Sequence, residues 1–258
     1  MRFRHKLSIV LVGLAIVPLA AVGVLVGVLL QRNQVTRVDN RLSVLAEAAA
    51  HGYTTQQQTA AAFALRVAAG KQVRLAFGSG TKPPRDISAP PGMTVVVLKN
   101  GVPIVGKPPR GPSWHATASV GKKEAGRQVN VYVPLTSALL NTIDTSAHLN
   151  LGNAALAFVA GGRTLGSTIG AVGPVKGLQA SGVGSATVAG TSVRAQPVQI
   201  PVLPVGPAYV VATYPSSTLS DAINSQRLRI LVPLLILGLL LIGGAIFAAD
   251  RISRASRG

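Results

Sequence analysis

The sequence contains no cysteine, so it has no disulfide framework, no thiolate nucleophile and no cysteine-based metal site. Acidic residues are also scarce, with only 7 Asp and Glu, and they form no close pair in the sequence for acid–base catalysis. The 4 His are scattered, without a second ligand at metal-binding spacing. The HExxH and GxSxG motifs are absent. We therefore expect no catalytic residues, no metal and no cofactor in this chain.

Positive charge and apolar side chains are plentiful instead. The 25 Lys and Arg give a formal net charge of +18, and 48% of the residues are hydrophobic. The charge is compatible with attraction to an anionic membrane or envelope surface, or with selective binding of an anionic small molecule. Nucleic acid is not expected as a partner, because the sequence has no recognised binding motif and no basic–aromatic run.

Two uncharged runs, Leu7–Leu30 and Ile230–Ala249, are long enough to form transmembrane helices. At about 1.5 Å per residue, the second run would span roughly 30 Å, the thickness of the hydrocarbon core. A signal peptide is the alternative for the first run. Ala20-Ala21 is followed by further apolar residues, Val22–Leu30, which favours an uncleaved membrane anchor.

Basic residues lie at both ends of the chain, where the positive-inside rule expects cytoplasmic segments. We therefore place residues 1–6 and 250–258 in the cytoplasm and the region between the spans outside the cytoplasmic membrane. The basic residues that support this topology are Arg2, Arg4, Lys6, Arg251, Arg254 and Arg257.

Residues 31–78 are predicted to form one long extracytoplasmic helix, because no proline occurs between Gln31 and Lys82. Apolar or small residues recur there in alternating steps of three and four, at Val35, Val38, Leu42, Leu45, Ala49 and Gly52. This stripe could form a heptad seam in a homodimer, or it could pack on its own domain. The GxxxG pattern of Gly23 and Gly27 would support close packing of transmembrane helices in a dimer.

The region after the long helix contains a repeated order of predicted elements. The first copy has a hairpin around Asn100-Gly101, two longer strands and a helix that begins near Leu135. The second copy follows the same order, and an offset of 80 residues aligns Ser137 with Ser217. The predicted strands are Met93–Leu98, Val102–Val105, Trp114–Val120, Arg127–Val133, Leu156–Val159, Arg163–Leu165, Val193–Val202 and Ala208–Tyr214.

The predicted fold is therefore an α+β membrane protein. Its two transmembrane helices (7–30 and 230–249) flank the long helix and two small antiparallel-sheet modules. The membrane-distal module would span 79–150, and the membrane-proximal module with its exit helix would span 151–229.

This layout, from Gln31 to Arg229, resembles the double Cache (PAS-like) sensor region of bacterial receptors. The tail Arg251-Ile-Ser-Arg254 is similar to the opening of a HAMP linker. The resemblance implies PAS-like modules that sense a ligand and signal through the second span. The output would belong to a histidine kinase, a diguanylate cyclase or a chemoreceptor, and no such domain is present in this chain. The alternative function is a membrane-anchored basic binding domain of the cell envelope, without a signalling role.

The first module is the better candidate for a ligand site. Trp114 and Tyr132 could form an aromatic wall, and His115 and Arg127 could supply polar contacts to a small molecule or an envelope partner. The alternative for Trp114 is ordinary packing in the core or on the surface, and the alternative for Arg127 is a solvated strand end. The second module, poor in aromatic and charged residues, is predicted to be a spacer or transmission unit.

Overall fold

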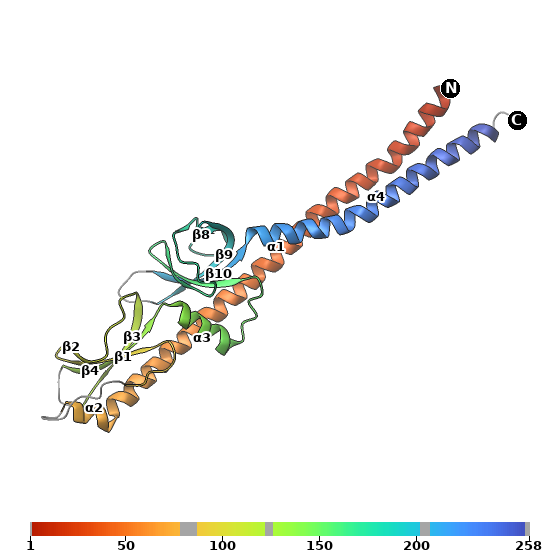
Figure 1. Ribbon diagram of the computed structural model, residues 1–258. Helices are drawn as coiled ribbons and strands as arrows, with labels where there is room; N and C mark the ends of the chain where they lie inside the picture. Colours follow the sequence, from red (N-terminus) through yellow and green to blue (C-terminus); the bar gives the residue numbers. More distant parts are fainter. Residues whose placement is uncertain (1, 78–86, 122–125, 202–206, 256–258) are drawn as a thin grey trace. The chain divides into compact units, whose positions relative to one another are not determined.

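The computed structural model describes residues 2–77, 87–121, 126–201 and 207–255. The chain divides into two compact units, one made of residues 1–38 and 217–258 and the other of residues 39–216. Helix α1 (Arg2–Ala69) begins in the first unit and continues unbroken into the second. Helix α4 (Ser216–Ala255) provides the rest of the first unit (Figure 1).

Both helices of the first unit are long and apolar enough to cross a membrane. The most apolar window has a mean hydropathy of 1.7 in α1 and 2.8 in α4, and neither window is buried in the structure. Large apolar side chains such as Leu14, Leu25 and Phe247 are exposed there. Exposure of such side chains is favourable in hydrocarbon and costly in water, so a lipid environment suits this unit.

The second unit contains two antiparallel sheets (Figure 1). The first sheet has the strand order β2-β1-β4-β3, with β1 (Thr94–Lys99), β2 (Val102–Val105), β3 (Ser113–Ser119) and β4 (Arg127–Pro134). The second sheet has the order β6-β5-β10-β9-β8-β7, with β5 (Ala155–Ala160), β6 (Arg163–Ser167), β7 (Val175–Lys176), β8 (Gly184–Val188), β9 (Thr191–Ile200) and β10 (Ala208–Pro215).

The strand orders show the repetition that the sequence predicts. The order β2-β1-β4-β3 corresponds to β6-β5-β10-β9, and each opening hairpin contains one register shift, after Val97 and after Phe158. Each copy also ends in a helix, which is α3 (Ser137–Ala147) in the first and α4 in the second. The sequence did not predict β7 and β8, which extend the second sheet beyond the shared order.

One stripe of α1 is buried within the chain. Its members recur at helical spacing: Leu42, Leu45, Ala46, Ala49, Tyr53, Gln57, Ala60, Ala64 and Ala68. Leu42, Leu45 and Ala49 belong to the predicted seam, so the stripe packs on its own domain and is not available as a dimer seam. The helix is also shorter than predicted: α1 ends at Ala69, and Gly70 separates it from α2 (Lys71–Ala76).

Helix α3 packs closely against three other segments, and each approach occurs at a glycine. A Cβ on Gly52 of α1 would lie 2.6 Å from Ile143 Cγ2, and one on Gly92 would lie 3.4 Å from Leu139 Cδ1. A Cβ on Gly166 of β6 would lie 2.5 Å from the backbone nitrogen of Ser137. The helix is capped by Thr136, whose hydroxyl accepts a hydrogen bond from Leu139 N. These approaches fix α3 against α1, the second sheet and the segment that precedes β1.

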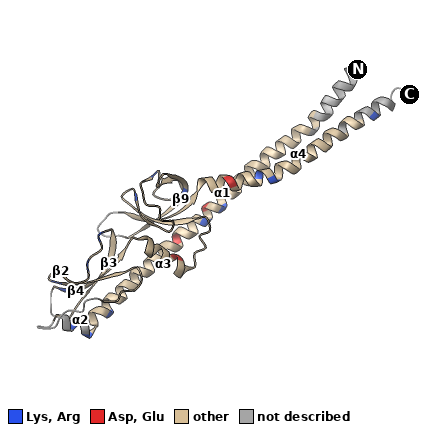
Figure 2. Cartoon of the chain, in the orientation of Figure 1, with Lys and Arg blue, Asp and Glu red and all other residues tan. Residues whose placement is uncertain are grey.

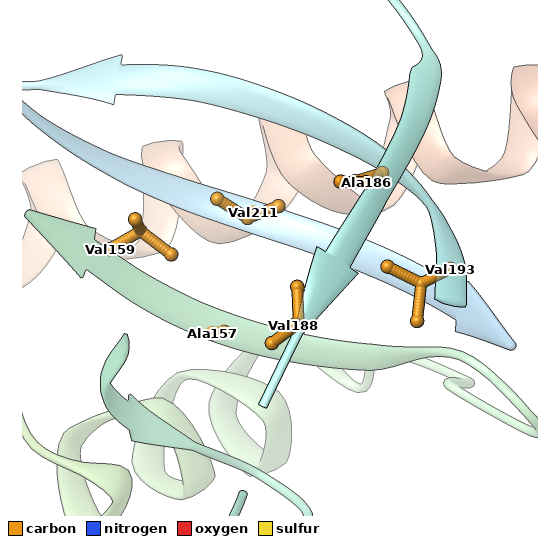
Figure 3. Close-up of a cluster of buried hydrophobic side chains, with 7 residues drawn as sticks. Ala157, Val159, Ala186, Val188, Val193 and Val211 are labelled. Carbon is orange, nitrogen blue, oxygen red and sulfur yellow. The ribbon is translucent and has the colours of Figure 1, made fainter. Parts of the chain in front are cut away.

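The second sheet is covered on one face by its own strands. Its cluster of buried Ala and Val side chains consists of Ala157, Val159, Ala186, Val188, Val193, Ala195 and Val211. Figure 3 shows Ala186 and Val188 of β8 gathered with residues of β5 and β10. Small side chains thus fill this face of the second sheet.

Phe158 points to the opposite face of β5, because it alternates with Ala157 and Val159. Its ring packs edge-on against Tyr53 of α1, with centroids 5.8 Å apart. Burial raises the pKa of Tyr53 to about 12, although the nearby Gln57 side chain offsets part of that shift. The Gln57 amide donates to Pro201 O, and the Tyr53 hydroxyl has no hydrogen-bond partner among the described residues.

We expect Gly52→Ala to lower the free energy of unfolding by about 1–2 kcal/mol, because the new methyl group overpacks against Ile143. The higher helix propensity of Ala, about 1 kcal/mol, opposes this loss and prevails once the clash is removed. In an Ile143→Ala background the same substitution should therefore stabilise the protein. The free energies of unfolding of the wild type, both single variants and the double variant form a double-mutant cycle. They are measured by urea titration of the full chain in detergent, with the fluorescence of the single Trp as the signal. Equal effects of Gly52→Ala in both backgrounds would contradict the packing described.

Tyr53 should make folding sensitive to alkaline pH. The folded pKa of about 12 lies above the unfolded value of about 10, so its stabilising contribution is complete below pH 10 and is lost as pH rises towards 12. Tyr53→Phe should remove this part of the pH dependence. The test compares the urea midpoints of the wild type and the variant from about pH 8 to about pH 11, where the unfolded Tyr loses its proton and the folded one keeps it. Parallel curves would show that Tyr53 ionises equally well in both states.

Candidate ligand-binding site on the first sheet

The four predicted site residues lie on two different faces of the first sheet. Side chains alternate along a strand, and directly opposed residues of neighbouring strands share a face. Trp114 pairs with Val133, and Arg127 lies on the same face of β4 as Val133. His115 pairs with Tyr132, so these two residues lie on the other face. The structure therefore does not gather the four side chains in one pocket.

Trp114 and Arg127 belong to the apolar face of this sheet, with Val129, Val131 and Val133. The guanidinium of Arg127 lies 5.1 Å from the ring centroid of Phe77, the residue that follows α2. The two side chains form a cation–π contact. Trp114 is half-buried at the other end of this face. Six residues of β4 separate Arg127 from Val133, the partner of Trp114, which is roughly 20 Å along a strand. Arg127 therefore packs on Phe77, too far from Trp114 for the two to share one small-molecule site.

His115 and Tyr132 do come together. Their ring centroids lie 5.2 Å apart, with an angle of 36° between the planes. His115 is exposed and Tyr132 half-buried, so one side of this aromatic pair faces solvent. Register and alternation place further polar residues on the same face of β1, β4 and β3, together with the apolar Val96 and Leu98. We call this surface the polar face; its polar residues are Thr94, Ser113, His115, Thr117, Ser119, Gln128, Asn130 and Tyr132.

Asn130 is the residue of the polar face that sequence reasoning missed. It is only 6% exposed, and its Nδ2 donates to the hydroxyl of Tyr132 at 3.4 Å. Its Oδ1 is buried and has no hydrogen-bond partner in the described part of the chain. A buried acceptor without a partner costs about 1–3 kcal/mol, so a ligand that donates a hydrogen bond here would recover that energy. An Asn between Val129 and Val131 in a valine-rich strand was the available signal.

Gly23 and Gly27, the predicted transmembrane packing residues, are turned towards α4 of the same chain. A Cβ on Gly23 would lie 3.8 Å from Leu231 Cδ2, and Gly23 and Gly27 line a groove between the two helices. Elsewhere in the described chain, no three His, Asp or Glu residues form a group that could hold a metal ion.

No family model and no curated protein matches the sequence. Among solved structures, the chain is similar to the ligand-binding domain of the Pseudomonas fluorescens chemoreceptor CtaA, crystallised in complex with L-isoleucine. The match covers 74% of this chain and 96% of that chain, with 13% sequence identity and a TM-score of 0.37. The chain itself combines helices and antiparallel sheets with two candidate membrane-spanning helices.

Asn130→Leu should leave the ligand-free protein as stable as the wild type, or more stable by about 1 kcal/mol, because it removes an unsatisfied buried acceptor. Val131→Ala, one residue away on the apolar face, should instead destabilise by about 1–3 kcal/mol through loss of packing. Urea titration of both variants provides the test. A large loss of stability in Asn130→Leu would mean that Oδ1 is satisfied within the folded chain.

Proposed function

We propose that this chain is the extracytoplasmic sensor and transmembrane signalling region of a two-span bacterial receptor. The observation that carries this proposal is the direct continuity between the domain and both candidate membrane helices. Helix α1 passes from the first unit into the second without a break, and α4 starts at Ser216, immediately after Pro215 ends β10. A displacement of β10 along its axis is therefore delivered to α4 without an intervening loop.

A pair of charged contacts joins α1 to the second sheet where the helix enters the second unit. Arg194 of β9 donates two hydrogen bonds to Asp39, from Nε to Oδ1 and from Nη2 to Oδ2, both at 2.7 Å. Nearby, Arg41 Nη2 donates to the carbonyl oxygens of Asn150 and Leu151, in the segment between α3 and β5. A bidentate pair fixes orientation as well as distance. Asp39 and Arg41 thus couple the position of α1 to β9 and to the link between the two modules.

The polar face is the proposed ligand site. The unpaired oxygen of Asn130 requires a hydrogen-bond donor, and the His115–Tyr132 pair offers an aromatic surface beside it. A small polar molecule with an amino or hydroxyl group fits this chemistry. Binding would favour one of two positions of the first sheet and of the segment before β1, which meets α3 at Gly92, and α3 contacts β6 of the second sheet.

The signal would then leave through the second span towards a cytoplasmic output domain of the kinase, cyclase or chemoreceptor type. In this proposal both termini are cytoplasmic, residues 250–258 begin a HAMP-like linker, and the chain itself is not an enzyme. The two modules correspond to the PAS-like pair of a double Cache region. The repeated strand order supports that assignment, because both modules are built on one plan.

The high positive charge favours a second candidate, a membrane-anchored domain that binds an anionic envelope surface. Lys and Arg greatly outnumber Asp and Glu along the described chain (Figure 2). Binding of this kind depends on total charge, weakens with salt and does not require the spans to move.

Binding and movement can be measured separately on the full chain in nanodiscs. A thermal-shift screen of amino acids, short carboxylates and other small polar molecules identifies the probe ligand. His115→Ala should weaken its binding about tenfold, because the variant loses half of the aromatic surface against which the ligand packs. Ser119→Ala, an exposed position on the same strand and face, is the matched control.

Because the protein has no native Cys, spin labels at Leu14→Cys and Phe247→Cys report the distance between the helices of the first unit. The ligand should shift this distance in the wild type, whereas Asp39→Asn should retain ligand binding and lose the shift. A distance that stays constant when the ligand is bound would reject signalling. Binding that falls with salt and ignores His115→Ala would support the anionic-surface function instead.

A further inference from the structure

The first unit contains an apolar groove that runs between α1 and α4. Its volume is about 770 Å³, and residues of both helices line it, including Gly27, Leu231 and Gly238. Ligand pockets in proteins usually range over about 300–1,000 Å³, so the groove is large enough for a small molecule or part of a lipid.

Glycines on both helices leave space between larger apolar side chains of the lining, and no side chain of the described residues fills it. A Cβ on Gly27 would meet no atom within 4 Å, and one on Gly238 would meet only the tip of Leu19 at 3.8 Å. In a bilayer such a space does not stay empty, because lipid tails are as apolar as the Leu and Ile side chains around it. The shape and the lining therefore suit a hydrocarbon chain.

Arg227 is the one polar residue of the groove lining. Its Nη2 donates to Gln31 Oε1 at 2.7 Å, which holds the guanidinium at the end of the groove. Its Nε is buried and has no hydrogen-bond partner among the described residues. Beside it, Gln34 Nε2 donates to Gln226 Oε1 at 2.9 Å and links the two helices. A held cation with an unused donor, at the mouth of an apolar groove, is a site for an anionic head group.

We propose that this groove binds one anionic phospholipid, with an acyl chain between α1 and α4 and the phosphate at Arg227. A second copy of the chain is a poorer occupant, because it would bring its own Arg227 and Arg229 to the same depth as those already there. A zwitterionic lipid would fill the groove but would not neutralise Arg227. The proposal extends beyond ligand sensing and requires only that both helices lie in a bilayer.

The test uses the full chain reconstituted in phosphatidylcholine vesicles, with spin-labelled phosphatidylglycerol or spin-labelled phosphatidylcholine as the probe. The fraction of motionally restricted label reports lipid held by the protein. The wild type should prefer phosphatidylglycerol about fivefold, the ratio expected for one cation near the membrane surface. Arg227→Gln should abolish this preference, and Arg229→Gln, which removes the same charge at an exposed neighbouring position, should retain it.

A second pair of variants tests the groove itself. Gly27→Leu should lower the restricted fraction of both labels, because the new side chain enters the groove without a clash. Gly243→Leu, on a part of α4 outside the groove lining, is its matched control. If the preference for phosphatidylglycerol survives Arg227→Gln, or is lost equally in Arg229→Gln, the lipid is held by general surface attraction and the proposed site is wrong. Restricted lipid that is unchanged by Gly27→Leu, or a dimer in the wild type that Gly27→Leu dissociates, would also overturn it.

Discussion

The second unit depends on one narrow buried stripe of α1. A helix presents about 100° of its surface to one core, and here that stripe lies along the part of α1 that enters this unit. Most of its buried positions are Ala, and Gly52 adds a point where α3 approaches the helix backbone. Short side chains allow this close packing, and close packing makes the relative positions of the elements sensitive to small changes.

The ion pair between Asp39 and Arg194 has a clearer role in orientation than in stability. Its side chains are 26% and 22% exposed, and pairs at such positions contribute on the order of 1 kcal/mol or less. Asp39 is nevertheless one of only 7 acidic residues in the chain. Its bidentate geometry holds β9 at a defined height on α1, next to β10 and hence next to the start of α4. A weak contact in this place therefore orients β9 on α1 more than it stabilises the fold.

The sequence was sufficient to predict the elements whose signals are local. Asn100 and Gly101 adopt positive φ angles of 50° and 80°, as the predicted hairpin turn requires, and the periodicity of α1 is present in the structure. Strand β7 was missed because its two residues, Val175–Lys176, have no periodicity to detect. Strand β8 was missed because it begins with Gly184 and has only one large apolar residue, Val188. The helical stripe was read correctly as apolar, but periodicity alone does not say whether a stripe packs on its own sheets or on another copy.

The candidate site likewise combines features that a local sequence pattern predicts with features that depend on the assembled sheet. Arg127 and Tyr132 are five residues apart on one strand, an odd number, so alternation alone could have assigned them to opposite faces. The pairing of His115 with Tyr132 depends on the register of β3 against β4, which no local pattern specifies. The unpaired oxygen of Asn130 depends on every neighbour around it. Its detection therefore required the assembled sheet.

The small side chains of the second sheet have a consequence for its evolution. The core around Val193 and Val211 is built from Ala and Val. A substitution there can remove only a few side-chain atoms, whereas most substitutions would add atoms. Truncation leaves small cavities, whereas enlargement forces the strands apart. Selection on this module should therefore act mainly against gains in side-chain volume. Its sequence can drift among the smallest apolar residues, while the spacing between its strands stays constant.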